Sequence, residues 1–499
     1  MVRKYISVVS ISAVTWPLSC SHGRCSEAAL SLRQAGEQHG HPLAFYAAEM
    51  PVIMWFRRDL RLADNPALNA ASDAPSDGVV PLFVVDPVLW NASGPARRAY
   101  LLASLRSLDD SLGGTLLIRR GEPAVVIPEL ARSLGIHRVH ISEDFGPYGR
   151  ARDSAVAAGL GSIPLISTGS PYAVSPGRVT KADGSPYRVF TPYYRAWAEH
   201  GWRGPAPVSE RTFIHAGISD ELPTVTDMPT GLTLPPAGEQ AAWQQWEKFR
   251  DGDLQRYASQ RDRPDLSATS GISQHLRWGE IHPRSLLSEL SQPDETFRKE
   301  LCWREFYADV LFHSPDSGHC SLDSRFDAMP WAQGQAADHA FHHWSEGTTG
   351  YPLIDAGMRQ LQAEGWMHNR VRMVTASFLV KDLHLPWQLG ARWFMQRLRD
   401  GDLASNVHGW QWVAGCGTDA APFHRVFNPV LQGLKFDPEG EYVRRYIPEL
   451  RHLGGAKAHE PWKFTDGYAK GYPTPVVDHA AERRIALEDY ATVRQPTGH

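Results

Sequence analysis

The runs VIMWF (residues 52–56), VVPLFVV (79–85), GTLLIRR (114–120) and RVHIS (138–142) decide the fold of the amino-terminal part of the chain. Each is a short apolar segment, as expected of a strand buried on both faces. Helical patterns lie between them, ARRAYLLASLRSLDDSL at 96–112 and AVVIPELARSLG at 124–135. This alternation predicts an α/β domain with a doubly wound parallel sheet. No G-x-G-x-x-G follows the first strand, so the dinucleotide-binding fingerprint is absent.

The composition changes after this domain. From about residue 170 to residue 238 the chain is rich in Pro, Gly, Ser and Thr, which is typical of a long surface connection. Beyond it, apolar residues recur with a helical period in the segments 241–259, 296–313, 354–364, 368–381 and 387–399. We therefore expect an α/β domain at 51–175, an interdomain linker at 176–238, an all-α domain at 239–475 and a C-terminal tail at 476–499.

The first fifty residues begin with a basic stretch and a short apolar run, which is also the pattern of a secretory signal peptide. The run is too short to span a membrane, no clear small-x-small cleavage pattern follows it, and the first strand begins directly after Met50. We expect residues 1–50 to be a non-native or unstructured extension, with Met50 as the natural start. A cytoplasmic location is the corresponding expectation.

Composition limits the classes of function. The 499 residues are 42% hydrophobic and 21% charged, which excludes wholesale disorder and suits two or three folded domains. The net charge of −4 means that any nucleic-acid partner needs a local basic patch. Five scattered cysteines predict reduced thiols and no metal site. Of 17 tryptophans, 11 fall between Trp243 and Trp412, a density that packing alone does not explain.

Two helical segments carry polar and aromatic groups on one face. In ELCWREFY, Glu300, Trp303 and Arg304 stand at i, i+3 and i+4, so that a carboxylate, an indole and a guanidinium lie together. An intrahelical Glu–Arg pair beside a core Trp would give the same pattern. In GWMHNRVRM, Asn369 and Met373 are one turn apart, although Met373 also suits an ordinary core position.

Three further segments have chemical content and structural alternatives. Seven Lys or Arg against two acids between Arg359 and Arg399 suit a phosphate-backbone footprint or a solvated helix face. DGDLASNVHGWQW (400–412) combines acceptors, Gly and two indoles, and its start also suits a helix cap. TSGIS (269–273) offers hydroxyls and backbone N–H groups to phosphate oxygens, or a plain N-cap.

Seven motifs together resemble one family. They are MWFRRDLRLADNPAL (54–68), TSGISQHLRWGEI (269–281), ELCWREFY (300–307), TGYPLIDAGMRQL (349–361), GWMHNRVRMVTASFLVKDL (365–383), DGDLASNVHGWQWVAGCGTDAAP (400–422) and FNPVLQGLKFDPEGEYVRRYIPEL (427–450). From Pro51 to about Pro461 the chain resembles the photolyase/cryptochrome flavoproteins, and is most similar to class I cyclobutane pyrimidine dimer DNA photolyases.

The resemblance implies an antenna domain at 51–175 and a helical domain at 239–475 that binds FAD and DNA. The residues that would hold FAD are Tyr257, Thr269, Ser270, Gly271, Ile272, Ser273, Arg372, Asp400, Asp402 and Asn406. Asn406 would face flavin N5. The family usually has a larger residue, often Arg, where this chain has Gly271, so one side-chain contact is missing from the pattern.

The substrate side follows from the same resemblance. Glu300 would hydrogen-bond the pyrimidine edge of the dimer, Trp303 and Trp412 would flank it, and Met373 would pack beneath it. The catalytic set implied by the family is Glu300, Trp303, Asn369, Met373, Asn406 and Trp412, and the DNA-binding set is Trp303, Arg304, Arg370 and Arg397. Photoexcited reduced FAD would donate an electron to a dimer flipped out of the duplex, and no metal or nucleophile would be needed.

The resemblance also assigns an electron-transfer chain and an antenna. Trp410, Trp387 and Trp331 match the indoles that carry electrons to an oxidised flavin, with Trp331 assigned across a spacer of variable length. Folate-binding relatives have an acidic residue just before an RARD-like segment, where this chain has Tyr148 and Gly149. This departure favours an 8-hydroxy-5-deazaflavin over methenyltetrahydrofolate, or an empty antenna site.

The predicted function is light-dependent repair of UV-damaged DNA by a deoxyribodipyrimidine photo-lyase, acting as a monomer. The main alternative is a cryptochrome-type blue-light receptor, although Asn406 and the short stretch after Pro461 favour repair. A single-strand-acting DASH cryptochrome is disfavoured by Trp303 and Met373, and a (6-4) photolyase by the lack of paired His in GWMHNR. A non-catalytic nucleotide-binding module leaves the helical half unexplained.

Overall fold

The computed structural model describes residues 50–494, except 75, 77 and 420–424. The expectation of an extension at residues 1–50 lies outside the described residues, apart from Met50. The described residues all belong to one compact unit. None of the helices in the described ranges has both the length and the apolar character needed to cross a lipid bilayer.

A five-stranded parallel sheet forms the amino-terminal part, in the order β3-β2-β1-β4-β5. The strands are β1 (Val52–Phe56), β2 (Val79–Val85), β3 (Leu117–Arg120), β4 (Val139–Ile141) and β5 (Leu165–Ser167). The apolar runs predicted the first four, and β1 and β2 have the predicted bounds. The three-residue β5 was not predicted. β1 is central and pairs with β2 and β4, so the strand order reverses between β1 and β4.

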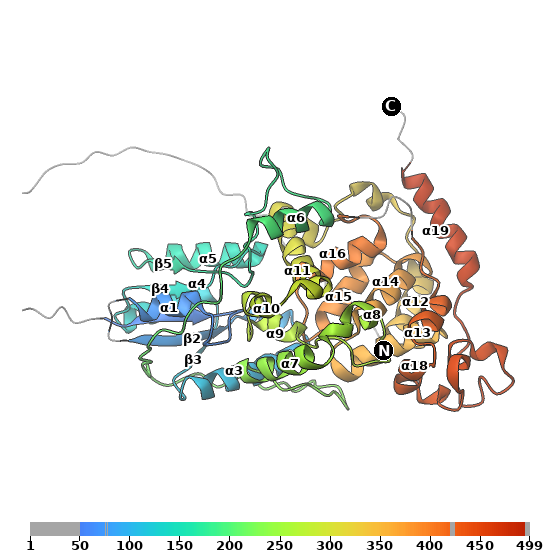
Figure 1. Cartoon of the computed structure of the whole chain (residues 1–499), viewed down its shortest axis with the longest axis horizontal. Helices are drawn as coiled ribbons and strands as arrows, with labels where there is room; N and C mark the ends of the chain where they lie inside the picture. Colours follow the sequence, from blue (N-terminus) through green and yellow to red (C-terminus); the bar gives the residue numbers. More distant parts are fainter. Residues whose placement is uncertain (1–49, 75, 77, 420–424, 495–499) are drawn as a thin grey trace, which may run out of the picture. The chain divides into compact units, whose positions relative to one another are not determined.

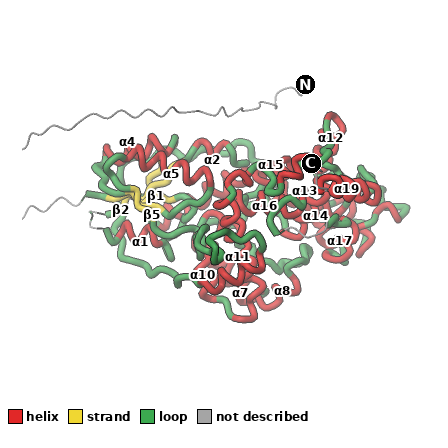
Figure 2. Tube along the Cα trace, turned by 90° about the horizontal axis from the view of Figure 1, so that it is seen from above, coloured by secondary structure: helices red, strands yellow, loops and turns green. Residues whose placement is uncertain are grey.

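Helices cover both faces of this sheet, which confirms the doubly wound arrangement. Side chains alternate along β1: Met54 packs toward α1 (Pro66–Ser72) and α3 (Pro95–Ser111), whereas Trp55 packs toward the other face. That second face is covered by α4 (Pro123–Ser133) and α5 (Pro147–Leu160). Figure 2 shows α4 and α1 on opposite sides of the strands. The short α2 (Pro87–Asn91) follows β2.

The segment 176–238 is more than the linker that its composition predicted. It contains α6 (Phe190–His200), whose Phe190, Tyr193 and Trp197 are buried in a core shared with the helical part. In Figure 1, α6 runs beside α11. Because the helix carries only one aromatic face among many Pro and Gly residues, the composition of the whole segment concealed it.

The carboxy-terminal part is helical, as predicted (Figure 1). Its α-helices are α7 (Glu239–Gly252), α8 (Tyr257–Gln260), α9 (Ser273–Trp278), α10 (Pro283–Glu289), α11 (Glu295–His313), α12 (Gly334–Glu346), α13 (Pro352–Glu364), α14 (Asn369–Lys381), α15 (Trp387–Arg397), α16 (Leu403–Ala414), α17 (Pro429–Phe436), α18 (Glu441–Tyr446) and α19 (His479–Arg494). Short 3-10 helices cover Leu254–Arg256, Gln292–Asp294, Pro315–Gly318, Ser324–Ala328, Pro448–Leu450, Gly455–His459 and Pro461–Lys463.

The predicted C-terminal tail at 476–499 needs correction, because α19 packs against the helical core. Nδ1 of His479 lies 2.5 Å from Oδ1 of Asp382, and Nε2 of His384 lies 2.8 Å from Oε2 of Glu482. Ala486 is buried. The few apolar residues of this helix gave too weak a periodic pattern to be recognised in the sequence.

The α/β and helical parts meet along a tightly packed contact that we call the seam. A Cβ atom at Gly94 would lie only 1.5 Å from the carbonyl oxygen of Gln396, so the backbones approach as closely as glycine permits. The buried Arg97 donates from Nε to the carbonyl oxygen of Leu398 at 3.1 Å. These contacts hold the start of α3 against the end of α15.

Candidate functional site

Glu300 lies on α11 beside a guanidinium that sequence analysis missed. Oε1 of Glu300 is 2.5 Å from Nη1 of Arg261, in the loop after α8, and both side chains are about a quarter exposed. Burial raises the pKa of Glu300 above its ordinary value, and the charge of Arg261 opposes part of that rise. The carboxylate is therefore partly shielded from water and already oriented before any ligand binds.

Trp303 stands one helical turn after Glu300 and is held from behind by Phe190 of α6. The two rings are parallel within 7° and their centroids are 3.7 Å apart. Stacking of this kind contributes about 1 kcal/mol beyond burial. Phe306 and Tyr307 contact Trp303 at centroid distances of 5.6 and 5.3 Å. Phe190 therefore covers one face of the Trp303 indole, and these contacts fix the orientation of the indole ring.

Trp412 is held by a hydrogen bond from its indole N–H to the main chain. Nε1 of Trp412 donates to the carbonyl oxygen of Asp419 at 3.1 Å. The side chain remains partly exposed, as does that of Met373 on α14. Asn369, one turn before Met373, is exposed, and its Nδ2 is 4.0 Å from the Met373 sulfur. Asn369 and Met373 on α14 and Trp412 on α16 therefore remain accessible to a ligand.

Asp400 is the centre of a buried polar cluster before α16. Its Oδ2 accepts hydrogen bonds from Nη2 of Arg372 at 2.8 Å and from Oγ of Ser273 at 2.7 Å. Burial alone would raise the pKa of Asp400, but Arg372 and the hydroxyl hold it below the ordinary value. The Oδ1 atom is buried and has no hydrogen-bond partner among the described residues. Such an orphaned acceptor is expected to receive a ligand N–H or O–H.

Asp402 has a largely structural set of contacts. Its Oδ1 accepts from the backbone N–H of Ser405 at 3.1 Å and caps α16, while Oδ2 pairs with Nη2 of Arg58 at 2.7 Å. Burial would raise the pKa of Asp402, but Arg58 and Arg277 lower it far more. The helix-cap alternative therefore describes this residue, which leaves less of its carboxylate for a flavin than the resemblance implied.

Asn406 is positioned one turn into α16. Its Nδ2 donates to the carbonyl oxygen of Ala391 in α15 at 2.9 Å, which fixes the amide orientation. The amide oxygen accepts no hydrogen bond from the described residues and is free for a donor on a ligand.

The segment around TSGIS supplies backbone more than side chains. Gly271 has φ +63°, a conformation that favours glycine, and its carbonyl oxygen accepts from Nε2 of Gln274 at 2.6 Å. The Ile272 side chain is buried in the core, so only its backbone is available to a ligand. Tyr257 is also buried, whereas Thr269 and Ser270 are partly exposed.

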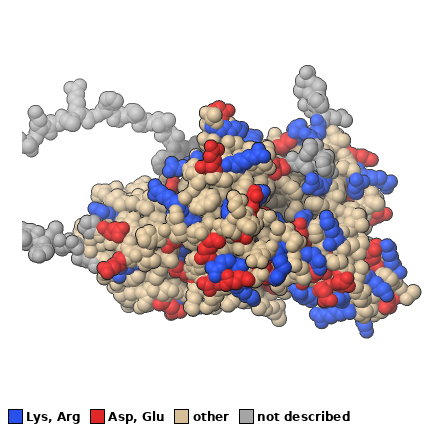
Figure 3. Space-filling view, in the orientation of Figure 1, with Lys and Arg blue, Asp and Glu red and all other residues tan. Residues whose placement is uncertain are grey.

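The three arginines proposed for DNA differ in availability. Arg304 requires correction: its Nη1 and Nη2 donate to the carbonyl oxygens of Pro171 and Leu276 at 2.9 and 3.2 Å, so it joins the α/β and helical parts. Arg370 pairs with Asp262 at 2.8 Å. Arg397 lies 3.1 Å over the Trp393 ring, and burial lowers its pKa to about 10. On the face drawn in Figure 3, basic and acidic side chains are interspersed.

Two of the three predicted electron-transfer indoles are buried and the third is partly exposed. Trp410 on α16 and Trp387 on α15 are buried, at 3% and 2% exposure, and Trp331 is partly exposed. Trp410 presses on α15 so closely that a Cβ at Gly390 would lie 2.0 Å from its Cη2 atom. Gly390 is one turn after Trp387. The partly exposed Trp331 is the member of the predicted chain that could exchange electrons with a reductant in solution.

A cluster of buried charges lies where the carboxyl ends of the central strands meet the helical part. Arg58 and Arg277 face Asp402 and Asp144, and Arg97 faces Asp402 and Asp400. Burial, with the like charge of Arg58, lowers the pKa of Arg277 to about 9. Nη1 of Arg277 is buried without a hydrogen-bond partner among the described residues. Such a nitrogen can receive a ligand oxygen.

Tyr148 and Gly149, at the predicted antenna position, are tied to this edge of the sheet. The Tyr148 hydroxyl donates to Oδ2 of Asp86 at 2.5 Å. A Cβ at Gly149 would lie 2.3 Å from the Asp144 carboxylate, so that only glycine fits there. The departure from the folate pattern therefore has a steric basis in this chain.

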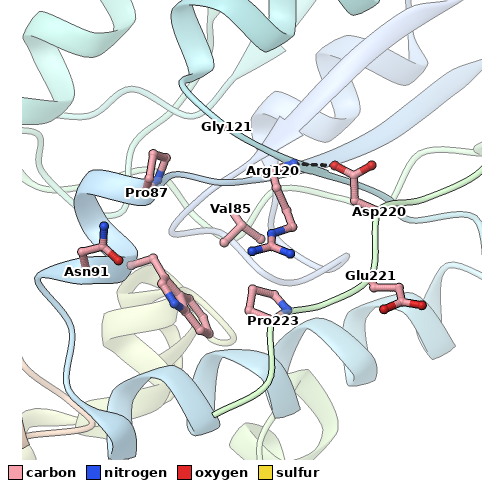
Figure 4. A pocket seen from close by; sticks show the side chains of 9 residues that line it. Val85, Pro87, Asn91, Arg120, Gly121, Asp220, Glu221 and Pro223 are labelled. Carbon is pink, nitrogen blue, oxygen red and sulfur yellow. Dashed lines mark hydrogen bonds between the residues drawn. The ribbon is translucent and has the colours of Figure 1, made fainter. Parts of the chain in front are cut away.

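A separate cavity of about 590 Å³ opens at the carboxyl ends of β2 and β3 (Figure 4). Its lining is Val85, Pro87, Trp90, Asn91, Arg120, Gly121, Asp220, Glu221 and Pro223. The polar side chains of this lining are exposed, in contrast to the buried charge cluster. Among the described residues no group of three His, Cys, Asp or Glu side chains could hold a metal ion.

Three residues of the site escaped sequence analysis. Arg261 is four residues after Tyr257. It stands next to Asp262 in a stretch without an apolar period, so nothing in the sequence singled it out. Phe190 lay within the segment predicted to be a linker. Asp419 lies within the recognised motif at 400–422 but was given no role, because only the fold brings it to Phe190. The single usable signal was the unusual FTPYY run that begins at Phe190.

Comparisons with known proteins agree with this geometry. Residues 52–210 match the family model described as DNA photolyase, and residues 297–492 match the FAD binding domain of DNA photolyase. A deoxyribodipyrimidine photo-lyase of Agrobacterium fabrum is 38% identical over 478 residues, which cover 90% of this chain and 99% of that protein.

Solved structures have the same architecture. A bacterial class III photolyase from Agrobacterium tumefaciens matches with a TM-score of 0.83 and 37% identity, over 91% of this chain and 100% of that one. A cryptochrome of Synechocystis matches with a TM-score of 0.79 and 26% identity, over 88% and 98%. With both domains matched in order and the relatives covered almost end to end, the chain belongs to the photolyase/cryptochrome family.

Proposed function

We propose that this protein splits cyclobutane pyrimidine dimers in DNA with an electron from photoexcited, reduced FAD. The observation that carries the proposal is the arrangement on α11, where the oriented Glu300 carboxylate and the Trp303 indole, covered on one face by Phe190, share one side of the helix. A carboxylate that hydrogen-bonds a pyrimidine edge, next to a flat apolar wall, suits an extruded base pair.

The polar groups on α14 and α16 fit FAD. The orphaned Oδ1 of Asp400 and the free amide oxygen of Asn406 are acceptors, as a flavin with ring and ribityl donors requires. Arg372 would keep Asp400 ionised, and the positive φ of Gly271 would bring backbone close to the pyrophosphate. When bound, reduced FAD would supply the light-driven electron for the reaction.

Glu300 has the central role among the protein groups. It would hydrogen-bond the pyrimidine edge, and in its protonated form, which burial favours, it would donate a hydrogen bond to the negative charge that develops on the dimer. Trp303 and Trp412 would exclude water and bind the dimer by stacking, which needs no sequence readout. Because a dimer is poorly stacked in its duplex, its extrusion costs less than that of intact bases.

A blue-light receptor with little repair activity is the second candidate, favoured by the likeness to the Synechocystis cryptochrome. The two candidates differ in one measurement. Purified protein, reduced and mixed with DNA that contains thymine dimers, should restore thymines under near-UV or blue light and not in the dark. A preparation that binds FAD but restores no thymines under light would contradict repair and favour the receptor.

We further propose that the buried charge cluster at the seam binds an antenna chromophore of the 8-hydroxy-5-deazaflavin type. Ligands of open parallel sheets bind at the carboxyl ends of strands where the order reverses, and the cluster lies beside that point. Three arginines and the unpartnered Nη1 of Arg277 suit a planar chromophore with acidic oxygens.

The antenna proposal has its own test. Protein reconstituted with 8-hydroxy-5-deazaflavin should bind it stoichiometrically, and Arg277→Met should weaken that binding at least tenfold while FAD content is unchanged. Equal binding by wild type and Arg277→Met, or preferential uptake of methenyltetrahydrofolate, would contradict it. A cytoplasmic location and a monomeric state stay predictions from the sequence.

A further inference from the structure

Two residues outside every predicted set connect the two indoles of the proposed lesion site. Asp419 follows α16 and Phe190 begins α6, 229 positions apart in the chain. Oδ1 of Asp419 accepts the backbone N–H of Phe190 at 3.2 Å. The backbone N–H of Asp419 in turn donates to the carbonyl oxygen of Arg188 at 3.1 Å. The hydroxyl of Thr418 donates to the same Arg188 carbonyl oxygen. We call these three hydrogen bonds, which join residues 418–419 to residues 188–190, the link.

Asp419 and Phe190 each hold one of the two indoles. The carbonyl oxygen of Asp419 accepts the indole N–H of Trp412 at 3.1 Å. The Phe190 ring covers one face of Trp303, with 3.7 Å between ring centroids. Because the Asp419 carboxylate fixes the Phe190 backbone, a shift of either residue is transmitted to both indoles.

The backbone of Asp419 supports a specific role. Its φ of +54° lies in the left-handed region, which costs an ordinary side chain free energy and which Asp and Asn tolerate best. Of the described residues other than glycine, only Asp64 and His384 share a positive φ. This conformation allows one residue to direct its carbonyl oxygen to Trp412 and its carboxylate to Phe190.

We propose that Asp419 and Phe190 are positioning residues that set the separation of Trp303 and Trp412 and so determine how tightly a pyrimidine dimer is held between them. The inference rests on the proposed repair function, since it needs the two indoles to flank the lesion. Within the described part of the chain, no hydrogen bond or ring contact joins either residue to Asp400 or Asn406, so the pair should affect lesion recognition without affecting the flavin groups.

Full-length holoprotein with Asp419→Ala, Asp419→Asn, Phe190→Leu or the control Phe341→Leu tests the inference. Phe341 also packs edge-on against an indole, Trp393, in the helical part but away from this link. The measurements are dark binding of a fluorescent oligonucleotide with one thymine dimer, binding of the undamaged oligonucleotide, and flavin absorbance.

We expect Asp419→Ala and Phe190→Leu to weaken dimer binding about tenfold, with flavin content and undamaged-DNA binding unchanged. Asp419→Asn keeps an acceptor and tolerates the positive φ, so it should stay within about twofold of wild type, as should Phe341→Leu. If wild type discriminates dimers and both Asp419→Ala and Phe190→Leu bind them normally, or if Asp419→Asn fails as badly as Asp419→Ala, the positioning role is wrong. If wild type itself ignores dimers, the repair function fails and this inference with it.

Discussion

The guanidinium of Arg261 lies 2.5 Å from the carboxylate of Glu300, so the group proposed to hold the pyrimidine already has a partner in the free protein. A ligand must therefore compete with Arg261 or bind the pair together. This relationship makes the pKa of Glu300 the balance of two effects, since burial raises it and Arg261 lowers it.

Arg261→Met should move the pH dependence of dimer binding. With the opposing charge removed, burial and the negative charge of Asp262 act on Glu300, and its pKa rises further. The inflection in a plot of dimer affinity against pH should shift to higher pH than in wild type. Arg263→Met is a matched control, because Arg263 pairs with Asp265 and not with Glu300. An unmoved inflection would show that Glu300 does not control binding.

Glu300→Ala should slow repair much more than it reduces FAD binding. Loss of one charge-stabilising hydrogen-bond partner in a water-poor site typically lowers a rate by about 10²-fold. Repair per photon absorbed at saturating DNA gives the first quantity, and flavin absorbance of the purified protein gives the second. Equal losses in both would make Glu300 a structural residue.

Trp387→Phe should block light-driven reduction of the oxidised flavin but spare repair by chemically reduced protein. Phe is far harder to oxidise than Trp yet fills most of the same buried space. Absorbance changes under blue light with an external reductant measure the first step. Trp90→Phe, in α2 of the α/β part, is the control and should photoreduce normally. Normal photoreduction of Trp387→Phe would exclude Trp387 from the chain.

Gly390→Ala should destabilise the protein although alanine favours helices. The added Cβ would lie 2.0 Å from Cη2 of Trp410 and 2.6 Å from Cδ2 of Leu379, and such overpacking costs about 1–3 kcal/mol. Gly409→Ala in α16 meets no neighbouring atom within 4 Å and should instead gain about 0.5–1 kcal/mol. Denaturant unfolding of both variants measures the difference, and a neutral Gly390→Ala would contradict the packing described.

Asp402→Asn should lower the free energy of unfolding at neutral pH by roughly 3 kcal/mol, because Arg58 loses its buried partner while the helix cap survives. The pKa of Asp402 is held below its ordinary value in the folded state. Its contribution is therefore complete above about pH 4 and is lost as the pH falls below that. The unfolding curves of variant and wild type should converge in acid; a constant difference would contradict the ion pair.

Much of the fold was predictable because buried strands and helices have continuous or periodic apolar patterns in the sequence. The run VVPLFVV is buried at every position, and its predicted bounds are those of β2. The helix predicted at 368–381 differs from α14 by one residue. In contrast, the three residues of β5 are too few to show a period, and α6 is surrounded by Pro and Gly.

The site residues were predictable only where they belong to a recognised motif. The motifs placed Glu300 and Trp303 correctly on a helix and Asp400 in the loop before α16. They could not show which polar side chains already have hydrogen-bond partners within the fold. Asp402 and Arg304 have typical ligand-binding side chains, yet both are engaged at the seam. Partners such as Arg261 come from loops. Which site residue a loop contacts depends on tertiary packing, and the loop sequence has no periodic apolar pattern from which that contact could be predicted.

The seam has a consequence for engineering. Because Gly94 lies against the Gln396 carbonyl and Arg97 hydrogen-bonds Leu398, the α/β part cannot be exchanged independently of the helical part. A chimera that borrows this half from a relative would need the glycine, the arginine and the receiving end of α15 transplanted together. Omitting any of the three would leave a collision or an uncompensated charge at the graft.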